Sequence, residues 1–347
     1  MASEGVELKK KIIVGVLIVL TLVFAVGAYV NNKFQKINYV DIYDEQEDLG
    51  INEKDPSNND EINEEKTIEN ILILGVDSRL NEYSSTRSDV IMVLSIDSEN
   101  EMFKFSSVMR DSYLYIPDKG YFDKVTHAYA FGGGLYALKT INTNLDLDCE
   151  EFVTVDFEAV ENIIDNVGGV EIDVDSSELP ELNRILTELN EYYSDNVELV
   201  NETGLISLNG RQAVAYARIR YDNGGDYERT LRQKEVVSSV FEQFKEMSIA
   251  DINSTVDDVL PLVSMSINKT ELLSYLAKVN EYKNYDIDMY GFPQNYSGFN
   301  YDSVYYVFPN SLNDEVSKLH EFIYGYENYV PSETVNGFSD RISSIIN

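Results

Sequence analysis

Three short runs of apolar residues, separated by polar turns, stand out in the first third of the chain. Residues 71–76 carry no polar side chain, and residues 90–96 and 102–109 are the second and third runs. The last two are joined by the polar turn at residues 97–100. Apolar runs of this length bounded by turn residues predict buried β-strands. Their order along the chain predicts a meander of neighbouring strands.

Charged residues stand at the ends of these runs. In a meander, the end of the first strand, the start of the second and the end of the third share one edge of the sheet. We therefore expect six residues to converge there: Asp77, Arg79, Arg87, Asp89, Arg110 and Asp111. Carboxylates suit a divalent cation, and guanidinium groups suit phosphates. The competing interpretation is that strand ends are solvated and therefore charged, and spacing alone does not decide between the two.

The remainder of the chain predicts one α/β domain over residues 68–347, a mixed central sheet with helices on both faces. Apolar periodicity predicts further strands and helices in alternation. The elements expected are strands at 152–156 and 170–174 and helices at 135–145, 157–167 and 178–193. Residues 249–347 lack an obvious catalytic motif and are expected to complete the sheet and its helices.

The N-terminal segment predicts a membrane anchor. Three lysines precede residues 12–30, an uncharged stretch long enough to cross the roughly 30 Å hydrocarbon core of a bilayer. We expect residues 1–11 in the cytoplasm, the domain outside the cell, and residues 31–67 as an acidic linker between them. The alternative is a cleaved signal peptide, with a small-residue processing site at residues 26–28.

Composition narrows the possible partners. A formal charge of -34 argues against nucleic acid and against anionic lipid headgroups. The hydrophobic fraction of 44% supports a real core, and a single cysteine, Cys149, excludes an internal disulfide framework. Most arginines nevertheless fall in two short stretches. That clustering predicts a local anion site on an acidic protein.

The second arginine stretch lies at residues 218–233. If Arg218 and Arg220 occupy a strand, their side chains face the same side and can form an anion clamp. Asp226 can begin a helix that presents three polar side chains on one face: Arg229, Arg232 and Gln233. The alternative is an exposed cationic helix face.

Three further features lie between the two arginine stretches. Lys124 is a candidate phosphate ligand, whereas His127 is more typical of a structural residue. The glycines at 132–134 could let backbone amides approach an anion.

Taken together, the motifs resemble the LytR-CpsA-Psr family of cell-wall enzymes from about residue 68 to residue 240. In chain order they are Gly75 to Arg79, Thr86 to Asp89, Arg110-Asp111, Lys124 with His127 to Tyr129 and the glycines, Arg218 to Arg220, and Gly225 to Gln233. One departure is Met109, because the family often has proline before its Arg-Asp pair. We interpret this as a local change of strand-end geometry.

The resemblance implies a transferase that moves a glycopolymer from a polyprenyl pyrophosphate carrier to a hydroxyl of peptidoglycan and releases polyprenyl phosphate. It implies that Asp77 and Asp89 hold a magnesium or manganese ion, and that Asp89 or Asp111 activates the hydroxyl. The pyrophosphate would be bound by Arg87, Arg110, Lys124, Arg218, Arg220, Arg229, Arg232 and Gln233. Such chemistry needs charge neutralisation and positioning, which suits these residue types.

Two other functions use the same residues. A hydrolase would cleave the same pyrophosphate with water as acceptor, and a silent membrane protein would bind lipid-linked precursors without transferring anything. An intact set of acidic and arginine residues argues against the silent protein. The resemblance also implies an apolar slot for the prenyl chain, but the sequence does not identify its lining.

Overall fold

The structure of the protein is a computed structural model that describes residues 34–42, 49–52, 68–76, 86–219 and 225–346. Within these ranges no helix is both long and apolar enough to cross a membrane. The predicted anchor at residues 12–30 lies outside them. Two parts of the predicted linker contact the domain. Asn38–Tyr39 form an edge strand, and Asn52 donates a hydrogen bond to the carbonyl of Thr143 over 2.9 Å.

A mixed seven-stranded sheet forms the centre of the molecule, with strand order β1-β10-β7-β2-β3-β4-β11. The predicted meander is confirmed, because β2, β3 and β4 pair antiparallel in chain order. β7 runs parallel to β2 on one side, and β11 runs parallel to β4 on the other. The bounds are β1 Asn38–Tyr39, β2 Ile68–Val76, β3 Ser88–Asp97, β4 Met102–Val108, β7 Glu151–Asp156, β10 Val263–Met265 and β11 Asp286–Phe292.

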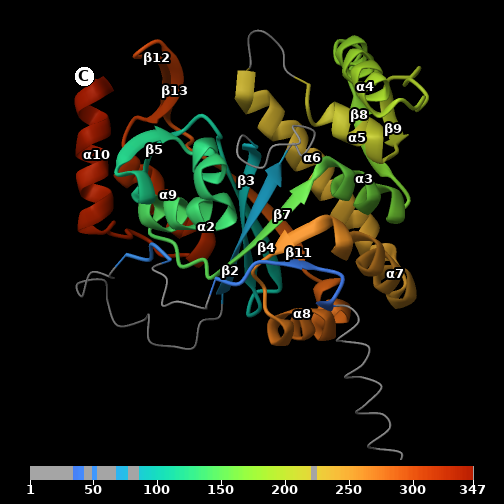
Figure 1. The fold of residues 1–347 in the computed structure, drawn as a ribbon, viewed down its shortest axis with the longest axis horizontal. Helices are drawn as coiled ribbons and strands as arrows, with labels where there is room; N and C mark the ends of the chain where they lie inside the picture. The colour runs from blue at the N-terminus through green and yellow to red at the C-terminus, as the bar shows by residue number, and fades with distance from the viewer. Residues whose placement is uncertain (1–33, 43–48, 53–67, 77–85, 220–224, 347) are drawn as a thin grey trace, which may run out of the picture.

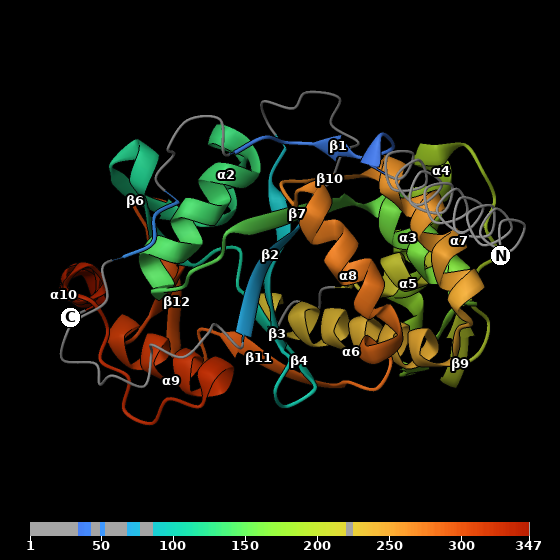
Figure 2. The same ribbon diagram turned by 90° about the horizontal axis from the view of Figure 1, so that it is seen from below.

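Helices cover both faces of this sheet, as predicted (Figure 1 and Figure 2). Strand residues alternate between two apolar clusters, since successive side chains point to opposite faces. Leu72 and Leu74 pack with α2, α9 and α10, whereas Ile71 packs with α3, α7 and α8. The bounds are α2 Thr126–Leu145, α3 Phe157–Asn166, α6 Gly225–Glu246, α7 Ile249–Val259, α8 Lys269–Tyr282, α9 Leu312–Tyr324 and α10 Glu333–Ile346.

A side lobe with its own apolar core stands beside the sheet. The predicted strand at 170–174 exists, but it pairs with β9 in a separate two-stranded sheet. Leucine and isoleucine side chains of α4 fill the core under that sheet. The bounds of the lobe are β8 Val170–Val174, α4 Leu179–Tyr193, β9 Gly204–Leu208 and α5 Gly210–Tyr216.

Two hairpins extend the fold beyond the central sheet. The first consists of β5 (Tyr113–Ile116) and β6 (Tyr121–Lys124), joined through a single turn of 3-10 helix. The second consists of β12 (Tyr296–Tyr301) and β13 (Val304–Pro309). An isolated parallel bridge between Ser112 and Val307 ties them together. The second hairpin rises at the upper left of Figure 1.

Helix α2 differs from its prediction, because it begins at Thr126 and includes the three glycines. The helix is kinked at Gly132 and Gly133, and Gly133 has a φ of 69° and a ψ of -154°. Gly134 lies against the ring of Phe152, where an added Cβ would approach a ring carbon to 2.1 Å. These glycines therefore bend the helix and allow it to pack closely on β7.

Candidate active site

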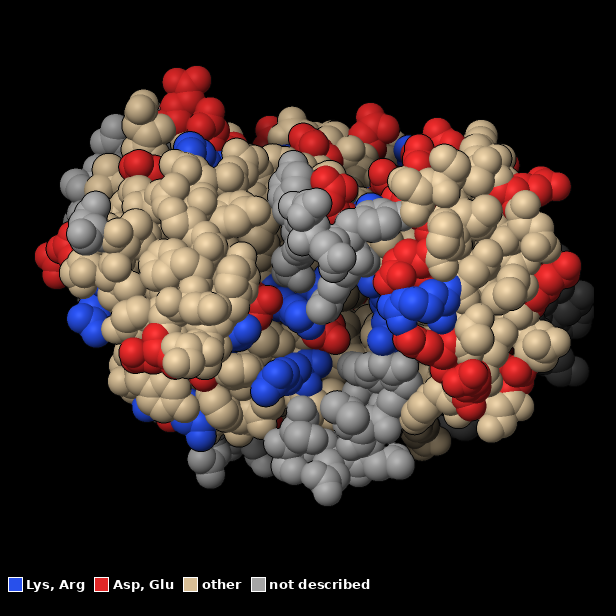
Figure 3. Space-filling model, turned by 90° about the horizontal axis from the view of Figure 1, so that it is seen from above, with Lys and Arg blue, Asp and Glu red and all other residues tan. Residues whose placement is uncertain are grey.

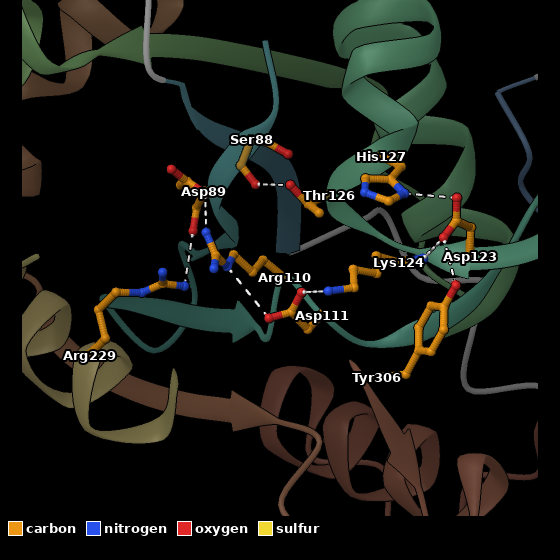
Figure 4. A network of polar contacts seen from close by, with 10 residues as sticks. All are labelled: Ser88, Asp89, Arg110, Asp111, Asp123, Lys124, Thr126, His127, Arg229 and Tyr306. Atoms are coloured by element: carbon orange, nitrogen blue, oxygen red, sulfur yellow. Dashed lines mark hydrogen bonds and ion pairs between the residues drawn. The ribbon is translucent and has the colours of Figure 1, made fainter. Parts of the chain in front are cut away.

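The candidate site gathers at one end of the central sheet, where several segments distant in sequence meet (Figure 4). The start of β3, the residues just after β4, the end of β6 and the start of α2 form most of it. Helix α6 and strand β13 each add one side chain. The residues involved are Ser88, Asp89, Arg110, Asp111, Asp123, Lys124, Thr126, His127, Arg229 and Tyr306.

Four predicted side chains form a chain of alternating charges. Arg110 donates from Nη1 to the Asp89 carboxylate, and its Nε lies 3.6 Å from Oδ2 of Asp111. Lys124 Nζ lies 2.7 Å from Oδ1 of Asp111. The side chain of Asp89 is 33% exposed, whereas that of Asp111 is 13% exposed. Asp111 is thus held between two cations, while Asp89 is the carboxylate more open to a ligand.

Backbone hydrogen bonds hold these strand ends together. The carbonyl of Asp111 accepts from the Val307 amide over 2.9 Å, and the carbonyl of Arg110 accepts from the Thr126 amide over 3.1 Å. The Thr126 hydroxyl in turn donates to the carbonyl of Ser88 over 2.8 Å. The spacing of the charged groups is therefore set by strand and helix backbone.

A second polar cluster adjoins Lys124, and the sequence did not identify two of its members, Asp123 and Tyr306. Nδ1 of His127 lies 2.8 Å from one oxygen of Asp123, and the Tyr306 hydroxyl donates to the other over 3.3 Å. Burial raises the pKa of Asp123, but hydrogen bonds from His127 and the Lys124 amide outweigh it and hold the pKa below its ordinary range. Burial and the Asp123 charge raise the pKa of Tyr306 to about 12.

The arginines of α6 are buried, so the exposed cationic face considered above is wrong. Arg229 reaches the carbonyl of Asp89 at 3.5 Å through Nη2, which places it at the site. Arg232 instead binds Glu178, with 2.7 Å between Nε and Oε1, and lies 3.4 Å from the carbonyl of Ile219. Gln233 is partly buried on the same helix.

The anion clamp considered for Arg218 and Arg220 required a strand, and Arg218 does not lie on one. Asn209 and Gln212 form a capping box that begins helix α5, and Arg218 lies in the turn after it. The Arg218 guanidinium stands 4.7 Å from the centre of the Phe157 ring. Arg87 is exposed just before β3. Three further predicted residues lie outside the described ranges: Asp77, Arg79 and Arg220.

The predicted metal ligands are Asp77, which lies outside the described ranges, and Asp89, which lies within them. Across the ranges that the structure describes, no group of three or more His, Cys, Asp or Glu side chains is arranged to hold a metal ion. A single protein carboxylate that shares a magnesium ion with substrate phosphates is a common arrangement, so Asp89 fits that role.

The charge pattern of the surface agrees with an anion site. Figure 3 shows basic side chains gathered in the middle of one face, between two lobes that carry mostly uncharged side chains with acidic ones along their edges. Acidic side chains lie among them. The fold and the site thus define a class of protein: a mixed α/β domain that presents guanidinium and ammonium groups, spaced by carboxylates, for a phosphate-bearing ligand.

The chain belongs to the LytR_cpsA_psr family, whose model matches residues 29–321. A polyisoprenyl-teichoic acid--peptidoglycan teichoic acid transferase TagU from Halalkalibacterium halodurans is 34% identical over 179 residues, which cover 51% of this chain and 54% of the relative. The match thus spans about half the length of that relative. The TagU of Bacillus cereus strain ATCC 14579 is 31% identical over 268 residues, 76% of this chain and 80% of the relative.

The fold agrees with this family. The crystal structure of TagV from B. subtilis is 26% identical and superposes with a TM-score of 0.57, covering 77% of this chain and 100% of that chain.

Proposed function

We propose that this protein is a phosphotransferase that moves a glycopolymer from a polyprenyl pyrophosphate carrier to a hydroxyl of peptidoglycan. The observation that carries the proposal is the alternating array Asp89, Arg110, Asp111 and Lys124 at the sheet end. The TagU relatives, which are transferases by name, support it. The acceptor hydroxyl oxygen attacks the phosphorus next to the sugar. The bond to the bridging oxygen breaks, and polyprenyl phosphate leaves.

The chain's own residues supply positioning and charge. Arg110, Arg229 and Lys124 bring positive charge to the place where the pyrophosphate develops negative charge. Asp111 touches both Arg110 and Lys124 and orients the two cations. Asp89 or Asp111 accepts the proton of the attacking hydroxyl, and Asp89 is the more exposed of the two.

The proposal includes a divalent cation, magnesium or manganese. Asp89 is the described carboxylate that would hold the cation, and the cation would neutralise phosphate charge. The proposal also includes the location: residues 12–30 anchor the chain in the membrane, and the domain acts outside the cell. The partners are then the lipid-linked glycopolymer, the peptidoglycan acceptor and the membrane itself.

A direct assay tests this function. The full chain in detergent is mixed with a polyprenyl pyrophosphate-linked sugar and magnesium, with and without peptidoglycan, and release of polyprenyl phosphate is followed. We expect release that depends on acceptor, and a loss of roughly 100- to 1000-fold in Arg110→Ala, the scale of losing one charge-stabilising donor. The matched control is Arg184→Ala, which removes an exposed arginine of α4.

The assay also separates the rival functions. Equal release without acceptor would make the protein a hydrolase. No release from any carrier, with carrier binding intact, would leave a silent binder. A chelator added before the carrier tests the cation, and activity unchanged by the chelator would remove magnesium from the proposal.

A further inference from the structure

The β12–β13 hairpin is built into the candidate site along one side. The amide of Val307 on β13 donates to the carbonyl of Asp111, and Tyr306 donates to Asp123. Phe299 and Phe308 on the same face of the hairpin stack at 4.6 Å between ring centres and pack on the core. This inner face is therefore fixed in position relative to the charged array.

The outer face of the hairpin presents an aromatic side chain to solvent. Tyr305 is 46% exposed, and it points to the opposite face from its strand neighbours Val304 and Tyr306. The Tyr305 ring lies across Gly298 of β12, where an added Cβ would come within 2.2 Å of the tyrosine hydroxyl oxygen. Asn300, also exposed, pairs with Tyr305 in the strand register. Because Gly298 has no side chain, the Tyr305 ring can lie over it, next to the exposed Asn300 side chain.

The hairpin region carries a single charged residue in a chain that is otherwise strongly acidic. From Met289 to Ser311 the sole charged residue is Asp302, although the whole chain carries a net charge of -34. Tyrosine, asparagine, glutamine and serine supply most of the polar groups in this segment. Such a surface neither attracts nor repels ions. It suits an uncharged polyhydroxylated partner, whose C–H faces stack on aromatic rings and whose hydroxyls bind amides.

We propose that the outer face of the β12–β13 hairpin, formed by Tyr305, Asn300 and Gly298, binds the uncharged glycan backbone of the acceptor. The identity of this glycan as the acceptor rests on the proposed transferase function. Tyr305 is two residues from Val307, or about 7 Å along a strand. A sugar on this face is therefore held beside the strand end that carries Asp111.

The composition of the hairpin favours a glycan over an anionic lipid surface. No lysine or arginine lies between Met289 and Ser311, and basic side chains are the groups that attract anionic headgroups. Exposed tyrosine also suits a membrane interface, so vesicles belong in the test.

Calorimetric titration of the full chain with oligomers of N-acetylglucosamine tests the inference. These oligomers are uncharged and contain no phosphate, so they do not report on the charged array. We expect binding that Tyr305→Ala weakens about tenfold, the scale expected on truncating a tyrosine anchor, and that Tyr305→Phe largely retains. The control Tyr192→Ala removes a tyrosine that is 50% exposed on α4 and should bind as the wild type does.

The possible outcomes separate this inference from the proposed function. Oligomer binding that depends on Tyr305 supports the glycan surface even if no carrier is cleaved. Oligomer binding that both alanine variants weaken equally, or binding to neutral phosphatidylcholine vesicles instead of oligomers, would overturn it. If transfer occurs, Tyr305→Ala should raise the KM for acceptor about tenfold and leave the KM for carrier unchanged. An unchanged acceptor KM would also overturn the inference.

Discussion

Arg232 shows how a residue can match a functional pattern and still have a structural partner. Its side chain is 7% exposed and pairs with Glu178, which is 11% exposed. The pair joins α6 to the segment before α4, and so fastens the side lobe to the helix that carries Arg229. These contacts indicate that Arg232 holds α6 in place.

We expect Arg232→Ala to lower the free energy of unfolding by about 3 to 5 kcal/mol, because it leaves the Glu178 carboxylate buried without its ion-pair partner. Urea unfolding of the full chain measures this. Arg184→Ala, which removes an exposed ion pair on α4, should cost less than about 1 kcal/mol. If the two variants were equally stable while Arg232→Ala lost carrier binding, the residue would belong to the ligand site instead.

Local sequence signals were sufficient for part of the site. Asp89, Arg110 and Asp111 follow from strand ends, and the pairing of β3 with β4 that brings them together needs only the short turn at residues 98–101. Tyr306 carried no such signal, because its contact with Asp123 spans 183 residues of sequence. That contact exists only after the hairpin docks on β5. Interactions set by docking of distant elements leave no pattern in the neighbouring residues.

At the scale of elements, the kink in α2 depends on one glycine conformation. Gly133 combines a φ of 69° with a ψ of -154°, a backbone region that residues with a Cβ rarely enter. Among the described residues, no neighbouring atom lies within 4 Å of the place where a Cβ would stand. The requirement for glycine is therefore conformational rather than steric.

We expect Gly133→Ala to lower the free energy of unfolding by about 1 to 3 kcal/mol through backbone strain alone. Thermal unfolding detects a change of this size. Gly337→Ala on α10 is a suitable comparison, since a Cβ there would contact no other part of the described structure and alanine favours helix. A neutral Gly133→Ala would show that α2 can straighten without loss.

Element boundaries were harder to predict than element types. The predicted helix at 135–145 exists, but α2 extends back to Thr126 because the glycines bend it without ending it. A strand was considered for Arg218 because of its two-residue spacing from Arg220, whereas the Asn209 and Gln212 capping box before it was a signal for helix α5. Capping residues mark a helix start by satisfying its first amides, which spacing does not report.

At the scale of the whole molecule, stability at low pH depends on carboxylates bonded inside an acidic protein. Burial raises the pKa of Asp97, but hydrogen bonds from Asn100 and Lys104 outweigh it and hold the pKa below its ordinary value of 3.8. Lys104 also donates to the carbonyl of Ile323 over 2.7 Å, so this carboxylate supports the packing of α9 on the sheet.

The sign of the pH effect follows from the lowered pKa. A carboxyl with a lower pKa in the folded state stabilises the protein above its ordinary pKa, and this contribution is lost as the pH falls through the folded value. At pH 7 we expect Asp97→Asn to lower the free energy of unfolding by about 2 kcal/mol. That difference from the wild type should shrink below about pH 4, as urea unfolding across pH would show. A difference independent of pH would contradict this assignment.

The overall architecture was predictable, but the side lobe was not. Alternating strand and helix patterns indicated a mixed sheet with helices on both faces, and the sheet has that form. The strand β8 has the same pattern as a central strand, yet it pairs only with β9 among the described strands. An apolar pattern indicates that a strand is buried, but it does not indicate which sheet the strand joins.

The order of strands in the sheet has a consequence for how the protein is made. The edge of β4 pairs with β11, so Met102 cannot reach its partner Asp286 until β11 has been synthesised. Asp111 finds its partner Val307 later again, because Val307 follows β11 in the chain. At ordinary rates of synthesis, roughly 180 residues take on the order of 10 to 40 s to emerge. For that time the nascent chain presents an apolar strand edge that can pair with other chains. Factors that keep this edge unpaired until β11 arrives should therefore limit aggregation of the newly made chain.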